Sequence, residues 1–446
     1  MNKRLVILGG GESGVGAALL ANKEGYNILL MDEGSLKDGY RSELQEAGIS
    51  FLENGIDANQ LLEADEVVKS PGIPDKNTWI LQLKQKGIPV ISEIELAYRH
   101  KGDSRIIAIT GSNGKSTTTA LTFHICKHAG LDCALVGNIG YSIARQVAED
   151  PKPLYVAEIS SFQLDDIITF RPDVAILLNI TEDHLDRYDY RFENYISSKF
   201  RITMNQTSKD YFIYNLDDEV IKRYLDQNQI HSIQLPISMK QKVEKGGYIK
   251  NDELHVKVNS EEQQMSIYDF ALKGKHNQYN TMAASVAGAT MDIRKNKIRE
   301  AVQTFENLEH RMEAIATVRG VEFINDSKAT NVNSTWFALE SMTKPTVLIL
   351  GGVDKGNDYS LLQDLVLEKV KAIVCMGIDN TKIHQAFGGK VNTIVDTASA
   401  EDAVRASFSL SVPGDVVLLS PACASFDLFK NYEDRGKQFK EAVKNL

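Results

Sequence analysis

Residues 105–119 constrain the fold of this chain more than any other stretch. The run 105–110 is rich in β-branched residues and predicts a buried strand, and residues 116–129 follow with the apolar periodicity of a helix. The junction at 111–116 reads Gly-Ser-Asn-Gly-Lys-Ser. Glycines in such a turn let backbone N–H groups face an anion at the helix N-terminus. The stretch therefore predicts an α/β domain built around a phosphate-binding loop.

Two side chains give this loop its chemistry. Lys115 can reach the β- and γ-phosphates of a nucleotide, and the Ser116 hydroxyl can hold Mg²⁺. The strict P-loop pattern has a further glycine where this chain has Ile109. A polar turn without a ligand is the alternative, but Gly-Lys-Ser at a strand-to-helix junction favours nucleotide binding. The predicted nucleotide-binding residues are Gly111, Ser112, Asn113, Gly114, Lys115, Ser116 and Thr117.

Length and composition bound the class of protein. A chain of 446 residues with 43% hydrophobic content is long enough for about three domains, each with its own core. A formal net charge of -10 without a basic segment argues against a nucleic-acid partner. The sequence contains no apolar run of bilayer length, so we expect a cytoplasmic protein that has no membrane partner. The four cysteines show no C-x-x-C spacing, which predicts reduced, mostly buried thiols.

A second glycine-rich turn lies near the N-terminus. Gly9, Gly11 and Gly14 satisfy G-x-G-x-x-G between a predicted strand and helix, and Asp32 ends the next predicted strand. This pattern predicts a site where a ligand's anionic group lies at a helix N-terminus and a protein carboxylate lies near a hydroxyl-bearing ring of the ligand. Both a dinucleotide and a nucleotide-diphosphate sugar fit such a site, so the pattern alone does not distinguish these two ligands. The unit is predicted to end near His100.

Polar residues also follow two later predicted strands. The strand 154–159 delivers Glu158, and the strand 174–178 delivers the cluster at 182–186, which contains His184. Carboxylates at strand ends beside a phosphate loop suit a metal ligand or a water-orienting group. A solvated acidic loop is the alternative for 182–186. Residues 248–258 predict a small antiparallel hairpin without chemistry.

The remaining sequence also alternates strands and helices. Residues 274–280 open a predicted helix at 281–291, where an asparagine would ordinarily serve as an N-cap. Further strands are predicted at 322–324, 346–350, 372–375 and 416–419, with helices at 334–340 and 400–408. This alternation predicts parallel sheets with helices on both faces and polar loops at the carboxyl ends of the strands.

Six strings together resemble the Mur ligases, the ATP-dependent amide ligases of peptidoglycan assembly. They lie at 110–116, 158–163, 179–184, 274–280, 310–311 and 325–330, and they follow the family order along the whole chain. Within the family, residues 137–140, 325–331 and 420–427 look most like the member that adds D-glutamate to UDP-N-acetylmuramoyl-L-alanine. The family uses a shortened phosphate loop, which accounts for the isoleucine at 109.

The resemblance implies a fold of three α/β domains, each with a mainly parallel sheet flanked by helices. The implied boundaries are 1–100 for a Rossmann-like UDP-sugar domain, 101–306 for a central P-loop ATPase-like domain with a small antiparallel element, and 307–446 for a Rossmann-like amino-acid domain. The implied reaction transfers the γ-phosphoryl group of ATP to the alanyl carboxylate. The D-glutamate amine then attacks the acyl phosphate, and ADP and phosphate leave.

The resemblance also implies roles for individual residues. Lys199 matches a lysine that the family carbamylates, which would turn a cation into an anionic ligand for a second Mg²⁺. Without the resemblance we would read Lys199 as a surface lysine on a helix. The implied catalytic residues are Lys115, Glu158, His184, Lys199 and Lys328; the metal ligands are Ser116, Glu158, His184 and Lys199; further ATP contacts are Asn277, Asn280, Arg311 and Asp326.

Substrate contacts are implied in the same way. The UDP-substrate residues are Glu12, Ser13, Asp32, Glu33, Gly72, Asn138, Ser160 and Gln163. The D-glutamate residues are Thr330, Lys355, Ser425, Phe426 and Tyr432. We expect a monomer whose partners are these small molecules, with ATP and two Mg²⁺ ions.

Other functions remain open at this point. A nicotinamide-dependent oxidoreductase would use residues 9–32 but leaves the loop at 111–116 unexplained. A non-catalytic nucleotide-binding regulator would not need Glu158, His184 and Lys199 together. Within the ligases, a family member that adds L-lysine or diaminopimelate and a folylpolyglutamate synthase are the alternatives.

Overall fold

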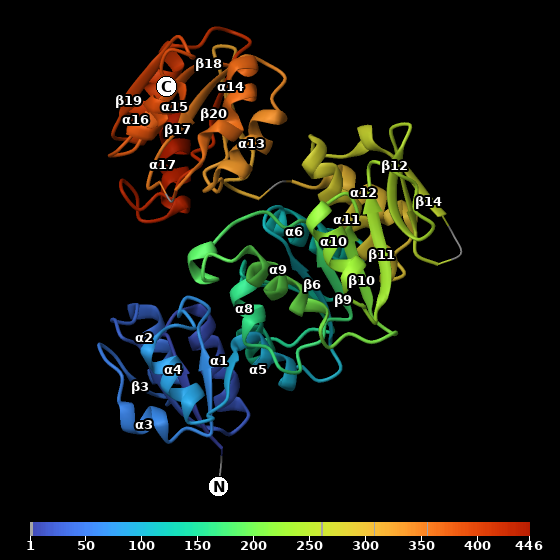
Figure 1. Ribbon diagram of the computed structural model, residues 1–446, viewed down its shortest axis with the longest axis vertical. Helices are drawn as coiled ribbons and strands as arrows, with labels where there is room; N and C mark the ends of the chain where they lie inside the picture. Colours follow the sequence, from blue (N-terminus) through green and yellow to red (C-terminus); the bar gives the residue numbers. More distant parts are fainter. Residues whose placement is uncertain (1–2, 260–261, 307, 355) are drawn as a thin grey trace. The chain divides into compact units, whose positions relative to one another are not determined.

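The computed structural model describes residues 3–259, 262–306, 308–354 and 356–446 (Figure 1). The chain divides into two compact units. The first comprises Met1–Ala271 and Asn277–Phe305, and the second comprises Leu272–His276 and Glu306–Leu446. The first unit contains two sheets and the second contains one.

The first sheet of unit 1 is parallel throughout and has the order β3-β2-β1-β4-β5. Its strands are β1 (Arg4–Leu8), β2 (Asn27–Met31), β3 (Ser50–Leu52), β4 (Glu66–Lys69) and β5 (Val90–Ser92). Its helices are α1 (Glu12–Lys23), α2 (Asp38–Glu46), α3 (Ala58–Leu62), α4 (Thr78–Gln85) and α5 (Glu93–His100).

The glycine-rich turn between β1 and α1 is as tight as its pattern predicts. Gly9 has φ +96°, and a Cβ atom on Gly14 would lie 1.8 Å from the Gly9 carbonyl oxygen. A side chain at position 14 would therefore push α1 away from the turn, because that oxygen belongs to the backbone.

The second sheet of unit 1 has the order β14-β13-β12-β11-β10-β9-β6-β8-β7. Its strands are β6 (Arg105–Thr110), β7 (Cys133–Gly137), β8 (Leu154–Glu158), β9 (Val174–Leu177), β10 (Tyr211–Asn215), β11 (Ile233–Ser238), β12 (Gly246–Lys250), β13 (Glu253–Lys257) and β14 (Glu262–Ser266). Its helices are α6 (Lys115–His128), α7 (Ile143–Glu149), α8 (Ser161–Asp165), α9 (Phe192–Phe200), α10 (Glu219–Gln227), α11 (Lys275–Thr290) and α12 (Lys295–Thr304), with short 3₁₀ turns at Leu185–Arg187, Arg201–Thr203 and Ile267–Asp269.

The predicted hairpin at 248–258 is present but larger than expected. β12 and β13 pair antiparallel around Asn251 and Asp252, whose positive φ angles of 51° and 59° suit a tight hairpin turn. β14 adds a further antiparallel strand, and β12 joins β11 in parallel. The hairpin therefore extends the main sheet.

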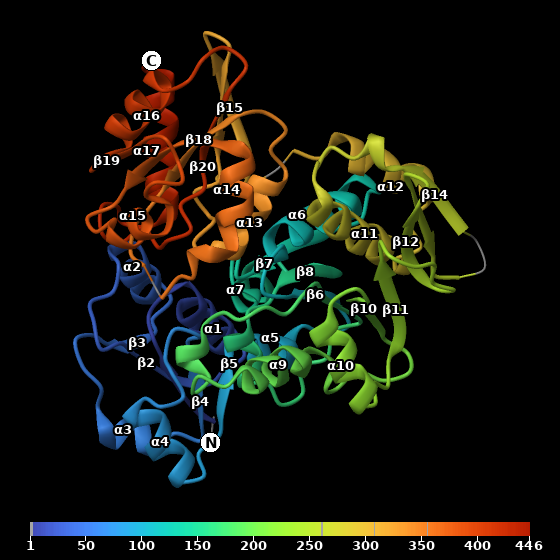
Figure 2. The same ribbon diagram turned by 45° about the horizontal axis from the view of Figure 1, so that its top comes forward.

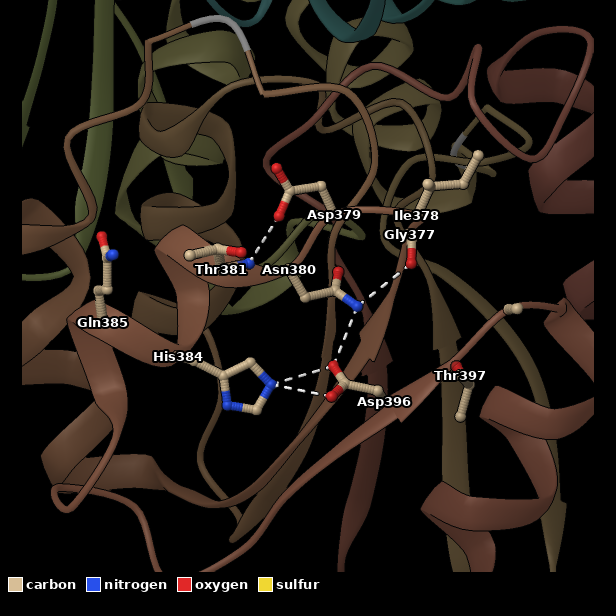
Figure 3. Close-up of a pocket in the computed structure, with 10 residues that line it drawn as sticks. Gly377, Ile378, Asp379, Asn380, Thr381, His384, Gln385, Asp396 and Thr397 are labelled. Carbon is tan, nitrogen blue, oxygen red and sulfur yellow. Dashed lines mark hydrogen bonds and ion pairs between the residues drawn. The ribbon is translucent and has the colours of Figure 1, made fainter.

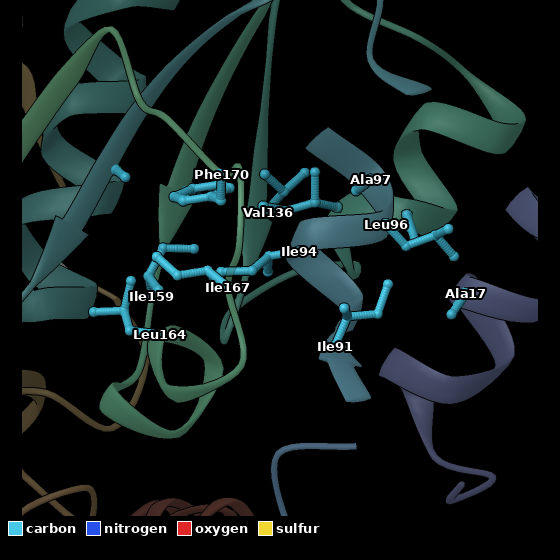
Figure 4. Packing of buried hydrophobic residues seen from close by; sticks show 14 of the residues in the cluster. Ala17, Ile91, Ile94, Leu96, Ala97, Val136, Ile159, Leu164, Ile167 and Phe170 are labelled. Atoms are coloured by element: carbon cyan, nitrogen blue, oxygen red, sulfur yellow. The ribbon is translucent and has the colours of Figure 1, made fainter. Parts of the chain in front are cut away.

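One apolar core joins the two sheets of unit 1. It contains Leu5 from β1 and Ala108 from β6, and α5 lies within it (Figure 4). Figure 4 shows Ile94 of α5 near Ile167 in this core. Polar contacts reinforce the junction, because the fully buried Glu95 accepts hydrogen bonds from the backbone N–H groups of residues 168–170.

Unit 2 holds a sheet of order β15-β16-β20-β17-β18-β19, in which β15 is antiparallel to β16 and the other pairings are parallel. Its strands are β15 (Glu313–Val318), β16 (Val321–Asn325), β17 (Thr346–Leu350), β18 (Val370–Met376), β19 (Ile394–Thr397) and β20 (Val416–Leu419). Its helices are α13 (Val332–Glu340), α14 (Gln363–Lys369), α15 (Thr381–Phe387), α16 (Ala400–Ser409) and α17 (Tyr432–Lys444), with a 3₁₀ turn at Tyr359–Leu362.

The helices of unit 2 cover both faces of this sheet (Figure 2). The core on one face contains residues of α13, α14 and α15, and the core on the other contains residues of α16 and α17. Three α/β domains with mainly parallel, partly mixed sheets confirm the predicted fold class. No helix within the described residues is both long and apolar enough to cross a bilayer. All four cysteines are free and buried, as predicted.

Candidate active site

The predicted phosphate-binding loop lies between β6 and α6, at the expected strand-to-helix junction. Gly114 is the N-cap of α6 and adopts φ +85°, a left-handed conformation that glycine accepts at little cost. A Cβ atom there would lie 2.5 Å from Oδ1 of Asn280. The loop therefore requires glycine at this position for both backbone conformation and space.

The Lys115 side chain folds back over its own loop. Its Nζ donates to the carbonyl oxygens of Gly111 at 2.9 Å and Ser112 at 2.8 Å. A loop that holds an ammonium this way presents a positive charge beside the N-terminus of α6.

Lys199 on α9 reaches the same loop. Its Nζ donates to the Gly111 carbonyl oxygen at 2.9 Å and lies 4.5 Å from the centre of the Tyr195 ring. The residue is only 1% exposed, so the surface-lysine alternative is wrong. Burial and then the nearby Lys115 charge lower the pKa of Lys199 well below its usual value, although Asp183 and Asp165 act in the opposite direction.

Residues that follow β9 form hydrogen bonds to the loop between β6 and α6. The Asn113 N–H donates to Oδ1 of Asn179 at 2.9 Å, and the Asn179 amide donates to the Asn113 carbonyl oxygen at 3.0 Å. The Ser112 hydroxyl donates to the Thr181 carbonyl oxygen at 2.9 Å. These contacts fix the loop shape, and Asn179 was not among the predicted site residues.

Glu158 ends β8 beside the loop strand. It pairs in register with Ile109 of β6 and is 1% exposed. Its Oε1 accepts a hydrogen bond of 2.8 Å from the Asn138 amide, a residue predicted to contact the UDP-substrate. The side chain of Asn138 thus orients a predicted metal ligand.

His184 lies in the polar segment after β9. Its φ of +53° is uncommon for a residue with a side chain, and such conformations gather at functional sites. Its Nε2 lies 3.6 Å from Asp183, and its ring packs edge-on against Phe162 with centres 5.1 Å apart. The side chain is 44% exposed, so it is accessible to a ligand.

The glycine turn after β1 forms a small pocket. Asp32 accepts hydrogen bonds from the N–H groups of Gly10 at 2.6 Å and Gly34 at 2.7 Å. Asp32 and Glu33 line a cavity of about 150 Å³ together with Leu8, Gly9, Met31, Ile56, Ile73, Asn77 and Trp79. A cavity lined by an indole ring, apolar side chains and a few polar groups suits a planar base. Trp79 carries no motif and was missed from the sequence.

Several predicted substrate residues make contacts within the protein. Glu12 accepts hydrogen bonds from the Arg145 guanidinium at 2.9 and 3.1 Å. Ser160 and Gln163 form a capping box at the start of α8, with the Ser160 N–H donating to Gln163 Oε1 at 2.9 Å. The Gly72 carbonyl oxygen accepts a hydrogen bond of 3.2 Å from Arg187. Ser13 lies in the first turn of α1.

Asn277 and Asn280 lie inside α11 and not at its cap. The prediction of a helix beginning at 281 was wrong, because α11 begins at Lys275. Both side chains are buried, and the Asn280 amide donates to Asn277 Oδ1 at 3.1 Å. Their spacing of three places them on one helix face, where Asn280 meets Gly114.

In unit 2, Asp326 follows β16 and is buried. It accepts hydrogen bonds from the Ser420 hydroxyl at 2.9 Å and from the Met312 N–H at 3.2 Å. Burial raises its pKa to about 7, although Ser420 and Arg311 act in the opposite direction. Arg311 therefore lies close enough to influence the Asp326 carboxylate.

Lys328 and Tyr432 also lie together, because the ammonium is 5.2 Å from the centre of the tyrosine ring. The fully buried Arg435 supports this segment through hydrogen bonds to the Ser327 hydroxyl at 3.0 Å and carbonyl oxygen at 2.8 Å. Burial lowers its pKa to about 10. Nothing in the sequence around Arg435 indicated this role.

The predicted D-glutamate residues are placed as follows. Thr330 lies between β16 and α13, Ser425 is buried after β20, and Phe426 is 70% exposed. Lys355 lies outside the described residues.

Three family models match the chain. The chain matches the MurD-like Mur ligase N-terminal domain over residues 3–92, the Mur ligase middle domain over 109–288, and the Mur ligase glutamate ligase domain over 310–423. The chain belongs to the Mur ligase family.

Relatives match along the whole chain. It is 54% identical over 446 residues to the UDP-N-acetylmuramoylalanine--D-glutamate ligase of Christiangramia forsetii, covering 100% of both chains. It is 50% identical over 449 residues to the enzyme of the same name from Bacteroides fragilis, again covering 100% of both.

Solved structures share the fold at low sequence identity. The UDP-N-acetylmuramate-alanine ligase MurC of Thermotoga maritima superposes with a TM-score of 0.62 at 17% identity and covers 100% of both chains. The MurF ligase of Thermotoga maritima in complex with ADP superposes with a TM-score of 0.60 at 14% identity, covering 94% of this chain and 95% of that one.

Proposed function

We propose that this protein joins D-glutamate to UDP-N-acetylmuramoyl-L-alanine, using ATP and releasing ADP and phosphate. The observation that carries the proposal is the convergence of Lys115 and Lys199 on one loop carbonyl oxygen, that of Gly111. This arrangement places the Lys115 charge where a triphosphate would meet the N-terminus of α6, and it brings the buried Lys199 amine to the same loop. The names of the full-length relatives support the choice of substrates.

A carboxylate does not condense directly with an amine, because oxide is a poor leaving group, so the carboxylate is first converted to an acyl phosphate. A carboxylate oxygen of the alanyl group attacks the γ-phosphorus of ATP, the bond to the β-phosphate oxygen breaks, and ADP leaves. The D-glutamate nitrogen then attacks the acyl carbon, and phosphate leaves with the former carboxylate oxygen. Phosphoryl transfer needs mainly positioning and charge neutralisation, and good orientation alone supplies roughly 7–11 kcal/mol.

The loop residues bind the nucleotide in this scheme. The backbone N–H groups and Lys115 hold the phosphates, so Lys115 exchanges its loop carbonyls for phosphate oxygens. The loop residues from Gly111 to Thr117, together with Asn277, Asn280, Arg311 and Asp326, are assigned to ATP. Lys328 is assigned to the transferred phosphoryl group.

Residues beside the loop fit Mg²⁺. Ser116 and Glu158 supply buried oxygen donors, the atoms Mg²⁺ prefers, and Asn138 orients the carboxylate. A free ammonium at Lys199 would repel a cation, but its lowered pKa favours the neutral amine that reacts with CO₂ to give a carbamate and a proton. Bound Mg²⁺ would neutralise phosphate charge there. We assign Ser116, Glu158, His184 and carbamylated Lys199 to two ions.

The remaining assignments concern the UDP-substrate, D-glutamate, the domain boundaries, the location in the cell and the oligomeric state. We assign the cavity at Asp32 and Glu33 to the uracil ring of the UDP-substrate. Ser425, Phe426, Thr330, Lys355 and Tyr432 are assigned to D-glutamate. We also propose domain boundaries at 100–101 and 306–307, a cytoplasmic location and a monomeric state.

A phosphate-release assay tests the function. The purified chain is given ATP, Mg²⁺ and UDP-N-acetylmuramoyl-L-alanine, and D-glutamate, L-glutamate, L-lysine and diaminopimelate are added one at a time. We expect release only with D-glutamate and only when the UDP-sugar is present. Release with L-lysine or diaminopimelate would assign the chain to a different amino acid, and tight ATP binding without turnover would support a regulator.

A further inference from the structure

Two neighbouring strands of unit 2 place a thiol beside a carboxylate. β18 and β19 are parallel, and their register pairs Cys375 with Asp396. Paired residues on adjacent strands face the same side of a sheet. Cys375 belongs to the core on the face that α15 covers, so both side chains lie beneath that helix.

Helix α15 supplies a third donor at the same place. His384 Nε2 lies 3.0 Å from each carboxylate oxygen of Asp396 (Figure 3). One ligand atom from each of Cys375, His384 and Asp396 can be chosen so that all three lie within 4.8 Å of one another. Among the residues that the structure describes, this is the one group of three or more such side chains with that geometry.

The distances suit a small tetrahedral ion. Zinc bonds of about 2.0–2.3 Å place tetrahedral ligand atoms about 3.3–3.8 Å apart. The 3.0 Å between His384 Nε2 and the Asp396 oxygens and the 4.8 Å limit for the whole group lie on either side of that spacing. The Asn380 amide donates to Asp396 Oδ1 at 3.0 Å and to the Gly377 carbonyl oxygen at 3.2 Å, and so holds the carboxylate in place (Figure 3).

The group opens onto solvent on one side. His384 and Asp396 are 42% and 57% exposed, whereas Cys375 is fully buried. A cavity of about 740 Å³ lies beside them, and Gly377, Thr381 and Gln385 contribute to its wall. A metal held by the three side chains would thus keep a fourth position open to water or to a small ligand.

We propose that Cys375, His384 and Asp396 form a zinc-binding site in unit 2, separate from the residues assigned to ATP and D-glutamate. A thiolate and an imidazole select zinc over Mg²⁺, which prefers oxygen ligands alone. On binding, the Cys375 thiol loses its proton to solvent and its sulfur bonds to the ion. The metal then ties β18, β19 and α15 together.

Cobalt binding to the intact chain tests this site. Reduced, metal-free protein is titrated with Co²⁺ in the absence of nucleotide, and the thiolate-to-cobalt charge-transfer band in the near ultraviolet is recorded. We expect one equivalent to bind and Zn²⁺ to displace it. Cys375→Ser should abolish the band, and Asn380→Ala should weaken binding by about 10–100-fold.

Two further variants keep the test decisive. His384→Ala removes an exposed ligand, so the fold should persist while binding weakens by at least about tenfold. Cys133→Ser removes a buried thiol in unit 1 and should leave the band unchanged. The proposal is overturned if no band forms, if the band survives Cys375→Ser, or if His384→Ala binds as tightly as the unmodified chain. The last result would reduce the His384–Asp396 contact to an exposed ion pair.

Discussion

The side-chain nitrogen of Lys199 lies 2.9 Å from the carbonyl oxygen of Gly111, a residue 88 positions earlier in the chain. This contact joins α9 to the phosphate-binding loop. Lys115 donates to the same carbonyl oxygen, so the two lysine side chains share one acceptor. Burial of Lys199 and then the nearby Lys115 charge lower its pKa and favour the neutral amine at position 199.

Lys199→Ala should lower turnover by about 10²-fold or more, because it removes the group assigned to the second Mg²⁺ ion. Small carboxylates such as formate or acetate should restore part of the activity by standing in for the carbamate. Steady-state phosphate release with and without added carboxylate measures both effects. Lys209→Ala, at an exposed lysine, is the control and should change neither.

Mass spectrometry of the intact chain, under conditions that preserve carbamates, gives an independent reading. Unmodified Lys199 together with an absence of carboxylate rescue would remove the carbamate from the proposal. The buried amine would then act only through its contact with Gly111.

Lys115→Ala should reduce phosphoryl transfer by at least about 10²-fold, since the loop loses the charge that meets the β- and γ-phosphates. Lys127→Ala, in the last turn of the same helix, keeps the loop intact and should retain normal turnover. Circular dichroism should show both variants folded. Normal turnover by Lys115→Ala would exclude the loop from the reaction.

Gly114→Ala should abolish ATP binding, and this loss should not be explained by the lower stability of the variant alone. Gly114 and Gly130 have nearly the same left-handed φ, +85° and +86°, but only Gly114 has a neighbour, Asn280, where a Cβ would be placed. Both alanine variants should lose about 1–2 kcal/mol of stability. Nucleotide titration should separate them, with Gly130→Ala binding normally. Equal affinities in the two variants would argue against a close-packed loop.

Glu93 should make stability depend on pH. Burial raises its pKa in the folded state to about 7, from an ordinary value of 4.5. The folded state therefore holds the proton more tightly, so the stabilisation from this group is full below pH 4.5 and is lost as pH rises to about 7. The loss amounts to about 3 kcal/mol.

Glu93→Gln removes that titration and can keep an oxygen acceptor for the Ala144 N–H. Relative to the unmodified chain, the variant should gain about 3 kcal/mol in unfolding free energy between pH 4.5 and pH 8, as measured by urea denaturation. Glu46→Gln, at an exposed glutamate, should show no such gain. An equal gain in unfolding free energy in both variants would mean that the effect comes from the change in net charge and not from the burial of Glu93.

Local pattern predicted most of the fold, because burial and backbone preference act within a few residues. β17 and β20 have the predicted bounds. The start of α11 was missed because Asn277 and Asn280 look like caps, and only their packing against distant groups shows why they lie inside a helix. The parallel pairing of β12 with β11 is a contact between two strands, and the periodicity of either strand alone does not encode it.

The candidate site divides in the same way. The loop residues carry a local motif, so their position was predictable. Burial of Lys199 depends on α9 packing against the loop, and without the family resemblance its sequence would have suggested a surface residue. Arg435 and Trp79 lie in segments without any motif, and their contacts exist only in the folded chain.

The mass of the UDP-sugar after a complete reaction tests the central claim most directly. With ATP, Mg²⁺ and D-glutamate, UDP-N-acetylmuramoyl-L-alanine should gain one glutamyl residue, with one ADP formed for each product molecule. An unchanged UDP-sugar in the presence of active, ATP-binding protein, or the addition of a different amino acid in preference to D-glutamate, would contradict the account.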